Sequence, residues 1–431
     1  MYLSGARAGR PVQNEAEADG GNGSDSGSAP RVPLNVKVLG VVSLLTDVSS
    51  EMLVAVVGYY LVYVLHQSTT AVGFLDGLYN GIPALLAIPA AYLADRYQRR
   101  KALAGVGYGL SAITKLGFPL VGPSFGGLGG LLSADRFGKG MRSAPRDALI
   151  SLSTPTEIQG RAFGVHRAMD TGGAFLGPLI AAVALSWTMT SGGERQAFNA
   201  VFIISFCVAA AGLAVFWLYV ADHRDPVQNR VHASFGAGLR LLGRPWFPRV
   251  TLAVVLLGLV GVSDTFVYLT LAHRMALSAM QYALLATGTT GSYLLLAIPF
   301  GRLADRVGHW RVFLAGHVAL FCVYLLLAEP WTGTGVLVAS LFLHGVFYAA
   351  TDGVLMAFAG PRLPSALRTS GLAVLQSAHA LAAFVSSVVF GVAWAHCDPR
   401  AVMLWFAAAL PLAVLAAVLL VSPWKESRDV G

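Results

Sequence analysis

Six formally charged side chains within apolar stretches of the sequence are the first candidates for chemistry. They are Asp47, Glu51, Arg136, Lys139, Arg167 and Asp170. Asp47 and Glu51 are four residues apart, which places both on one face of a helix. An ionisable side chain in the middle of a membrane costs about 2.5 to 3.5 kcal/mol on insertion scales, so six facing lipid would cost on the order of 15 to 20 kcal/mol. No marginally stable fold tolerates that cost, so we expect these groups to face one another or a water-filled cavity.

These three acids and three bases have two interpretations. In the first, Asp47, Glu51 or Asp170 exchanges a proton when its basic neighbour moves away, because a buried carboxylate without such a neighbour favours its neutral form. In the second, pairs such as Arg136 with Asp170 only fix the packing of helices. The sequence leaves both interpretations open.

Fewer polar side chains interrupt the apolar stretches of the second half of the chain. The candidates for substrate contact are Asp264, His344, Gln376 and His379. A histidine titrates near neutral pH, but on a helix it also serves as a hydrogen-bonded packing residue, so both roles stay open. Asp76 and Lys115 are assigned to an outer vestibule or to structure.

The composition is that of an integral membrane protein. Of the 431 residues, 55% are hydrophobic and 12% are charged, against roughly 25% charged in an average soluble domain. The net charge of +8 comes from basic residues between apolar runs rather than from a basic stripe with interleaved aromatics, so we expect no nucleic-acid partner. The three cysteines lie far apart without metal-binding spacing, and we expect no disulfide framework and no metal site.

The apolar runs are long enough to count membrane helices, each of which needs about 20 residues. They cover roughly 36–65, 72–93, 102–121, 125–150, 161–187, 198–220, 250–272, 282–303, 312–328, 335–358, 371–396 and 402–421. This pattern predicts a cytoplasmic tail over 1–34, a six-helix unit over 35–220, a linker over 221–249, a second six-helix unit over 250–422 and a tail over 423–431. The Gly, Ser, Asp and Glu in the first 30 residues predict a disordered tail.

The distribution of basic residues predicts the orientation. With a cytoplasmic N-terminus, the outer turns contain only Arg195, Arg274 and Arg400 of the 30 lysines and arginines. Nearly all the others then lie on the cytoplasmic side or within helices, as the positive-inside rule requires. We therefore expect both termini in the cytoplasm and the chain in the plasma (inner) membrane.

A repeat relates the two halves. Residues 81–101 and 291–311 both contain LLAIP followed by LADR, and ten of the 16 aligned pairs from Gly81/Gly291 to Arg96/Arg306 are identical. Each copy is an apolar run that ends in Asp-Arg and further basic residues. Such a repeat indicates a duplicated unit of about half the chain.

The chain resembles the major facilitator superfamily in this repeated turn, in its two sets of six helices and in its basic central linker. Arg136 to Gly140 is similar to the family's RxxQG motif, with Lys139 in place of glutamine. A stretch of the fifth helix resembles the motif of the proton-coupled exporters through Gly164, Gly173, Gly177 and Pro178. Close packing of helices through small residues is the alternative explanation for that stretch. The resemblance implies an all-α membrane protein with 12 transmembrane helices in two pseudo-symmetric six-helix bundles, of the drug/proton antiporter type.

The resemblance also implies a conformational latch. Its residues are Asp95, Arg96, Arg99, Asp147, Asp305, Arg306 and Asp352. In the implied arrangement, Arg96 or Arg99 pairs with Asp147 and Arg306 pairs with Asp352, closing the cytoplasmic side when the protein opens outward. It further implies that His344 and His379 lie on helices bordering a central cavity.

No phosphate-binding loop, zinc-protease motif, nucleophile elbow or dinucleotide-binding fingerprint is present in the sequence, so we expect neither an enzyme nor a cofactor. The expected function is alternating-access export of a small molecule, driven by proton entry, by a monomer in the lipid bilayer. One alternative is proton-coupled uptake of a metabolite or organic anion, with Arg136, Lys139 and Arg167 receiving its carboxylate or phosphate. A second is export of a divalent metal bound by Asp47, Glu51, His344 and His379, provided that they converge. A membrane sensor without transport activity would leave the internal charges unexplained.

Overall fold

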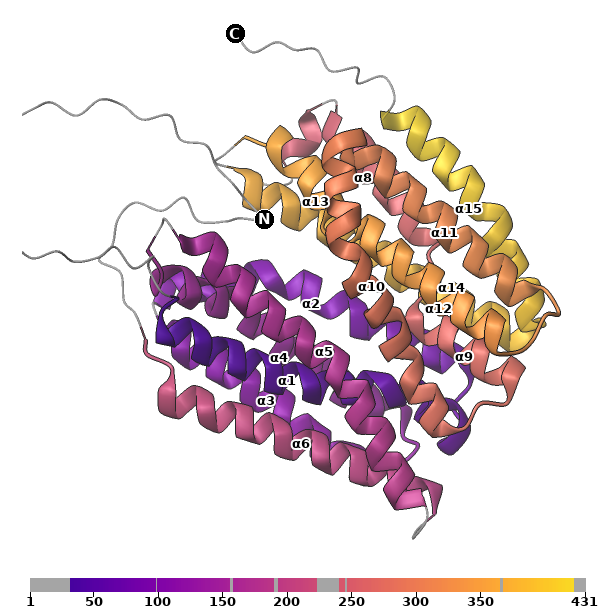
Figure 1. The fold of residues 1–431 in the computed structure, drawn as a ribbon, viewed down its shortest axis with the longest axis horizontal. Coiled ribbons are helices and arrows are strands. Elements are labelled where there is room, and N and C mark those ends of the chain that lie inside the picture. The colour runs from indigo at the N-terminus through magenta and orange to yellow at the C-terminus, as the bar shows by residue number, and fades with distance from the viewer. Residues whose placement is uncertain are drawn as a thin grey trace, which may run out of the picture.

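The computed structural model describes residues 32–97, 99–155, 158–189, 193–222, 240–244, 246–364 and 367–421. Residues 1–31 of the predicted N-terminal tail, the whole predicted C-terminal tail, most of the predicted linker and the side chains of Asp95 and Arg96 lie outside the described residues. All regular secondary structure within them is helical, as predicted. Figure 1 shows the helices in two bundles, the first in indigo to pink and the second in salmon to yellow.

The first bundle contains six long helices, because six apolar runs of the sequence are separated by short polar turns. They are α1 (Leu34–Tyr59, extended by a π-helical turn, Tyr60–Val64), α2 (Thr69–Tyr97), α3 (Arg100–Val121), α4 (Phe125–Leu152), α5 (Gln159–Met189) and α6 (Glu194–Tyr219). α1 packs against α5 and α6, and α4 packs against α2 and α3.

The second bundle also spans the membrane six times, but two of its spans are broken. Its helices are α8 (Trp246–Leu259), α9 (Asp264–Met275), α10 (Ala279–Val307), α11 (His309–Ala328), α12 (Thr334–Thr351), α13 (Val354–Ala359), α14 (Arg368–His396) and α15 (Pro399–Val421). The expectation of continuous helices over 250–272 and 335–358 was therefore wrong. The first break lies between Leu259 and Asp264, and the second lies at Asp352 and Gly353, where Gly353 has a φ of 76°, a backbone conformation outside any right-handed helix.

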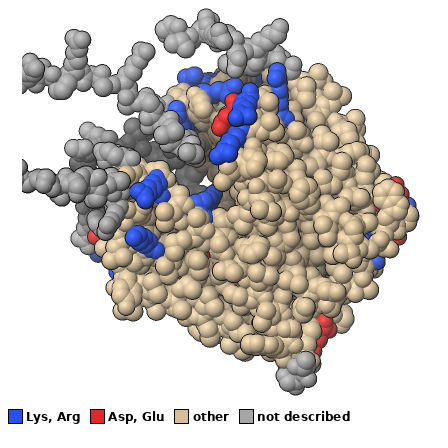
Figure 2. Space-filling view, viewed as in Figure 1, with Lys and Arg blue, Asp and Glu red and all other residues tan. Residues whose placement is uncertain are grey.

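The outer surface of both bundles is apolar. Leu120, Trp187 and Leu295 are each at least three-quarters exposed, and Figure 2 shows a broad surface almost free of charge below a group of lysines and arginines. Nine helical segments of the described chain are long and apolar enough to span a membrane. The more polar α2, α3 and α4, of 29, 22 and 28 residues, complete the twelve spans.

The two bundles pack against each other through α2 with α14 and through α5 with α10. We name the end of the molecule where α1 begins and α6 and α15 end the linker end, and the opposite end the far end (Figure 1). At the far end, α2 and α14 approach closely at Gly73 and Gly391. A Cβ atom on Gly391 would lie 3.0 Å from the Cα of Gly73, and a Cβ atom on Gly73 would come nearer still to the Ser387 carbonyl oxygen. Only glycine permits this approach, so the bundles are tightly joined at the far end.

Candidate functional site

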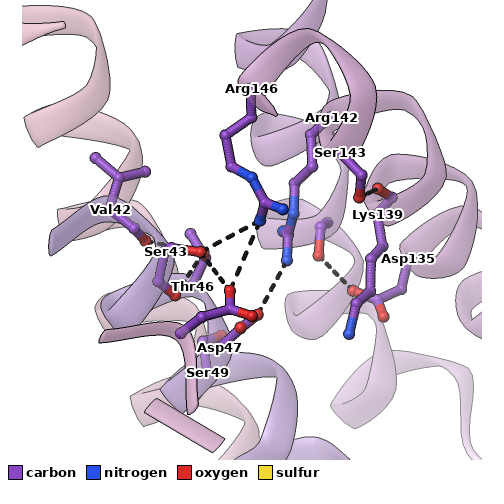
Figure 3. A network of polar contacts seen from close by, with 12 residues as sticks. Val42, Ser43, Thr46, Asp47, Ser49, Asp135, Lys139, Arg142, Ser143 and Arg146 are labelled. Carbon is purple, nitrogen blue, oxygen red and sulfur yellow. Dashed lines mark hydrogen bonds and ion pairs between the residues drawn. The ribbon is translucent and has the colours of Figure 1, made fainter. Parts of the chain in front are cut away.

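Ion pairs between α1, α4 and α5 form a polar network within the first bundle (Figure 3). The Arg142 guanidinium lies 3.5 Å from the Asp47 carboxylate, and Arg146 lies 3.7 Å from Asp170. The Ser43 hydroxyl donates a hydrogen bond of 2.6 Å to Asp170. Two arginines of α4 therefore neutralise one carboxylate on α1 and one on α5. Such pairing is what allows charges to lie between membrane helices.

A second network lies deeper between α3 and α4, around Asp135, whose side chain is fully buried. Its carboxylate receives hydrogen bonds from Ser111 at 2.5 Å, Lys115 at 3.0 Å and Arg136 at 2.6 Å. The Arg136 guanidinium also lies 3.7 Å from the centre of the Tyr79 ring. Arg136 and Lys115 are thus held by one carboxylate, so Lys115 belongs to the structure of the first bundle.

The pair of Arg136 with Asp170, given as an example under the packing interpretation, is not formed, because Asp135 and Arg146 hold these two side chains instead. Sequence reasoning missed Asp135, Arg142 and Arg146, which supply the actual partners. Their spacing was the available signal: Asp135, Arg142 and Arg146 follow one another at seven and four residues, and so share one face of α4.

Glu51 differs from Asp47 in having no direct partner among the described residues. It is half-buried, and within the described part of the chain it forms no hydrogen bond or ion pair. Its main electrostatic neighbours are Lys139 and Arg136 of its own bundle and Asp264 of the other. Glu51 therefore lies between the charges of the first bundle and those of the second.

Two of the predicted motif glycines on α5 pack against the charged segment of α1. A Cβ atom on Gly173 would lie 3.1 Å from the Asp47 side chain, and one on Gly177 would lie 2.7 Å from the Val48 carbonyl oxygen and 2.8 Å from the Glu51 side chain. Gly164 has nothing within 4 Å at the corresponding position. Pro178 is buried beside Gly177. Gly173 and Gly177 thus bring α5 against the turns of α1 that contain the two carboxylates.

A cavity of about 450 Å³ lies between the two bundles and extends into the second. Its walls come from α1, α2, α4, α8, α9, α11, α12, α13 and α14. Three predicted substrate residues line it, Asp264, Gln376 and His379. The surface is hollowed between the bundles at the linker end, next to the basic residues (Figure 2). The cavity therefore occupies the position expected for a central binding site in a two-bundle transporter.

The broken helices of the second bundle bring carboxylates to this cavity. Asp264, at the first residue of α9, accepts a hydrogen bond of 2.6 Å from the Tyr348 hydroxyl and lies 3.3 Å from Nε2 of His344. His344 is buried behind Asp264, so it positions that carboxylate rather than lining the cavity. Asp352, in the second break, accepts a hydrogen bond of 3.1 Å from the Tyr293 hydroxyl.

The far end of the cavity is closed by hydrogen bonds between the bundles. Asp76 of α2 accepts one from Thr265 of α9 at 2.6 Å and one from Ser387 of α14 at 2.7 Å. Thr69 donates to the Gly391 carbonyl at 3.0 Å. Asp76 is therefore a contact between the bundles as well as part of the cavity wall.

Among the described side chains, which do not include that of Arg96, the implied pairs of Arg99 with Asp147 and of Arg306 with Asp352 are not formed. Asp147 lies 3.0 Å from Arg146, Asp305 lies 3.2 Å from Nε2 of His309, and Asp352 is bonded to Tyr293 rather than to Arg306. Arg99 is exposed. Because the linker end is the open one here, the latch proposed for the opposite conformation stays a prediction.

Two alternatives for the site lose support. The divalent-metal alternative needs Asp47, Glu51, His344 and His379 to converge, but no group of three or more potential metal ligands is found among the described residues. The organic-anion alternative needs bases that reach the cavity, but none of its three bases lines the cavity wall. Arg136 is buried against Asp135, Arg167 is exposed beside Asp170, and Lys139 is half-buried on α4.

Twelve membrane spans in two bundles around a shared cavity are the architecture of a membrane transporter. The sequence profile of the Major Facilitator Superfamily matches residues 39–284 and 264–430, and this chain belongs to that family. An uncharacterised MFS-type transporter of Methanocaldococcus jannaschii is 27% identical over 375 residues, which cover 84% of this chain and 88% of the relative. An uncharacterised protein of Mycobacterium tuberculosis is 34% identical over 186 residues, 42% of this chain and 43% of that protein.

Solved transporters share the fold. The nucleoside transporter NupG superposes with a TM-score of 0.75 at 14% identity, covering 91% of this chain and 100% of NupG. A POT family transporter in complex with 5-aminolevulinic acid superposes with a TM-score of 0.73 at 14% identity, covering 90% of this chain and 96% of the other. At such identities the likeness concerns the fold alone.

Proposed function

We propose that this protein exports a small molecule by alternating access and that proton entry drives the export. The observation that carries this proposal is the position of Asp47 and Glu51. They lie one turn apart on α1, beside the bases of α4, and Val54, three residues after Glu51, lines the cavity. In a proton-driven transporter, we expect titratable side chains to lie between the internal ion pairs of a bundle and the substrate cavity.

The two carboxylates support different steps. Glu51 has no direct basic partner among the described residues, so a proton that binds it displaces no ion pair. Asp47 is paired with Arg142, so a proton that binds Asp47 releases the arginine and changes the charge balance between α1 and α4. Proton entry and rearrangement of the first bundle are thereby linked.

The conformation supports alternating access. The far end is closed through Asp76 and the glycine contacts of α2 with α14, and the linker end is hollowed. Rocking of one bundle against the other would break the first set of contacts and close the hollow. Such motion exposes the same cavity to each side of the membrane in turn.

The direction of transport is proposed from the α5 motif and the charge distribution. Gly173 and Gly177 belong to the stretch that resembles the proton-coupled exporters, and they hold α5 against the carboxylates of α1. Basic residues gather at the linker end (Figure 2), which supports the proposal that this end faces the cytoplasm. The cavity would then load from the cytoplasm, as an exporter requires.

The test uses purified full-length protein in liposomes containing a pH-sensitive dye. A panel of organic cations, organic anions, nucleosides and divalent metals is added under an imposed pH gradient, and proton movement is recorded. We expect at least one compound to elicit proton flux that Asp47→Asn and Glu51→Gln abolish. The matched control is Asp222→Asn, an exposed carboxylate just after α6, which should leave the flux unchanged.

If both Asp47→Asn and Glu51→Gln retain the full proton flux, these two carboxylates do not couple proton entry to transport. Transport that does not respond to the pH gradient would contradict proton coupling itself.

A further inference from the structure

We infer that the cavity binds a small organic cation with an aromatic or aliphatic body, and that Asp264 and Asp352 supply the charge that recognises it. This inference rests on the proposed transport function and concerns the substrate class of the same cavity. The charges of the described cavity wall are all negative. The wall contains three carboxylates, Asp76, Asp264 and Asp352, and no lysine or arginine among the described residues that form it.

The basic residues near the cavity do not compensate these carboxylates. Arg142 and Arg146 are paired with Asp47, Asp147 and Asp170, while Lys115 and Arg136 are paired with Asp135. Lys139 forms no ion pair among the described residues, and its charge acts mainly on Asp47 and Glu51 of its own bundle. Neither Asp264 nor Asp352 forms an ion pair with a lysine or arginine within the described part of the chain. Within the described residues, the second bundle thus presents negative charge to the cavity without a lysine or arginine as counter-charge.

Asp264 and Asp352 can each accept further hydrogen bonds. The contacts of Asp264, with Tyr348 and His344, both go to Oδ1, and the contact of Asp352, with Tyr293, goes to Oδ2. The other oxygen of each carboxylate has no partner among the described side chains, although a carboxylate has about four acceptor positions. Asp76 differs, because both of its oxygens are bonded to the other bundle.

The helix breaks are a second, independent feature that favours a cation. α8 ends at Leu259 and α12 ends at Thr351, so both present the carbonyl end of a helix toward the cavity, whose wall includes Leu257, Gly258 and Thr351. The carbonyl end of a helix carries partial negative charge. In broken membrane helices such ends are suited to cations.

The other side chains of the cavity wall indicate that the uncharged part of the ligand is aromatic or aliphatic. Phe347, Tyr348 and Phe313 line the cavity together with several aliphatic residues. Aromatic faces attract organic cations by about 0.5 to 2 kcal/mol each, whereas a bare metal ion would need a set of converging ligands that the described residues do not form. The volume of about 450 Å³ lies within the usual range for small-molecule sites.

The test measures equilibrium binding to full-length protein in detergent, without a proton gradient, by isothermal titration calorimetry. Three probes share a naphthyl ring and differ in charge: (1-naphthylmethyl)trimethylammonium, 1-naphthylacetamide and 1-naphthylacetate. We expect the cation to bind at least about tenfold more tightly than the other two, as expected for a desolvated charge pair. Asp264→Asn and Asp352→Asn should each weaken cation binding by about tenfold and change amide binding by less than about twofold.

Controls separate recognition of charge from folding. Asp222→Asn should bind the cation as the wild type does, and Asp264→Glu, which restores the charge, should recover most of the affinity. Equal affinity for the three probes, no cation binding by folded protein, or unchanged cation binding in both asparagine variants would overturn the inference. Cation binding without proton-driven flux would contradict the proposed function alone, whereas proton-driven flux of an anion would contradict this inference alone.

Discussion

The Asp76 carboxylate of α2 accepts a hydrogen bond of 2.6 Å from the Thr265 hydroxyl of α9, which joins the two bundles at the closed far end of the cavity. A hydrogen bond to a charged group contributes about 1.5 to 3 kcal/mol. Because the two residues belong to different bundles, this contribution stabilises one conformation of the transporter over the other.

Removing this contact should favour opening of the far end. Thr265→Val keeps the size of the side chain and removes the donor, so we expect a shift of roughly 10- to 150-fold toward the far-open state. Spin labels at Gly193 and Thr332, in a variant without Cys207, Cys322 and Cys397, should report longer distances by electron–electron double resonance. Thr251→Val is the matched control, since its hydroxyl bonds within its own helix to Phe247. An identical distance distribution in Thr265→Val and the control would contradict a gating role for Asp76.

The α5 glycines should differ in their tolerance of a methyl group. In Gly177→Ala the new Cβ atom would lie 2.7 Å from the Val48 carbonyl oxygen, and overpacking of this kind costs about 1 to 3 kcal/mol. Gly164→Ala meets nothing within 4 Å and gains helix propensity. Thermal unfolding in detergent should therefore show a lower midpoint for Gly177→Ala and an equal or higher midpoint for Gly164→Ala. Equal midpoints would mean that the motif does not act through packing against α1.

Asp135 should be the most important carboxylate for stability. Asp135→Asn would leave Lys115 and Arg136 buried without their counter-charge, and breaking a buried pair costs about 3 to 5 kcal/mol. Loss of folded protein, or a much lower unfolding midpoint, should be visible by size-exclusion chromatography and thermal scanning. Asp147→Asn removes a half-exposed carboxylate beside Arg146, and the expected loss is about 1 kcal/mol or less. If Asp135→Asn and Asp147→Asn lower the unfolding midpoint by similar amounts, burial of the Asp135 network does not account for its contribution to stability.

The latch predicted around Asp352 can be separated from the hydrogen bond observed there. If Asp352 pairs with Arg306 when the far end opens, Asp352→Asn weakens that state and favours opening of the linker end. A cysteine at Met356, which lines the cavity, should then react faster with a maleimide added from that side. Tyr293→Phe removes only the hydrogen bond seen in this conformation and should slow the reaction or leave it unchanged. An unaltered rate in Asp352→Asn would argue against the latch.

The sequence by itself determined the number of membrane spans, the internal repeat and the family. Each of these follows from the composition or the order of nearby residues. A membrane span needs only about 20 apolar residues, and the repeated LADR turn is read directly from the order of residues. The internal charges were also visible, since few ionisable residues interrupt the apolar runs. Their need for partners followed from the cost of placing charge in lipid.

The partners themselves were decided only by tertiary structure. Arg142 and Arg146 were not among the residues selected from the sequence, yet they reach Asp47 and Asp170, because helix packing fixes which faces meet. The breaks at Asp264 and Asp352 were hidden within apolar runs, where hydropathy does not register a turn of the backbone. The bond of Asp76 with Thr265 joins residues 189 positions apart. No local pattern specifies such a contact, because it exists only when the two bundles meet in one conformation.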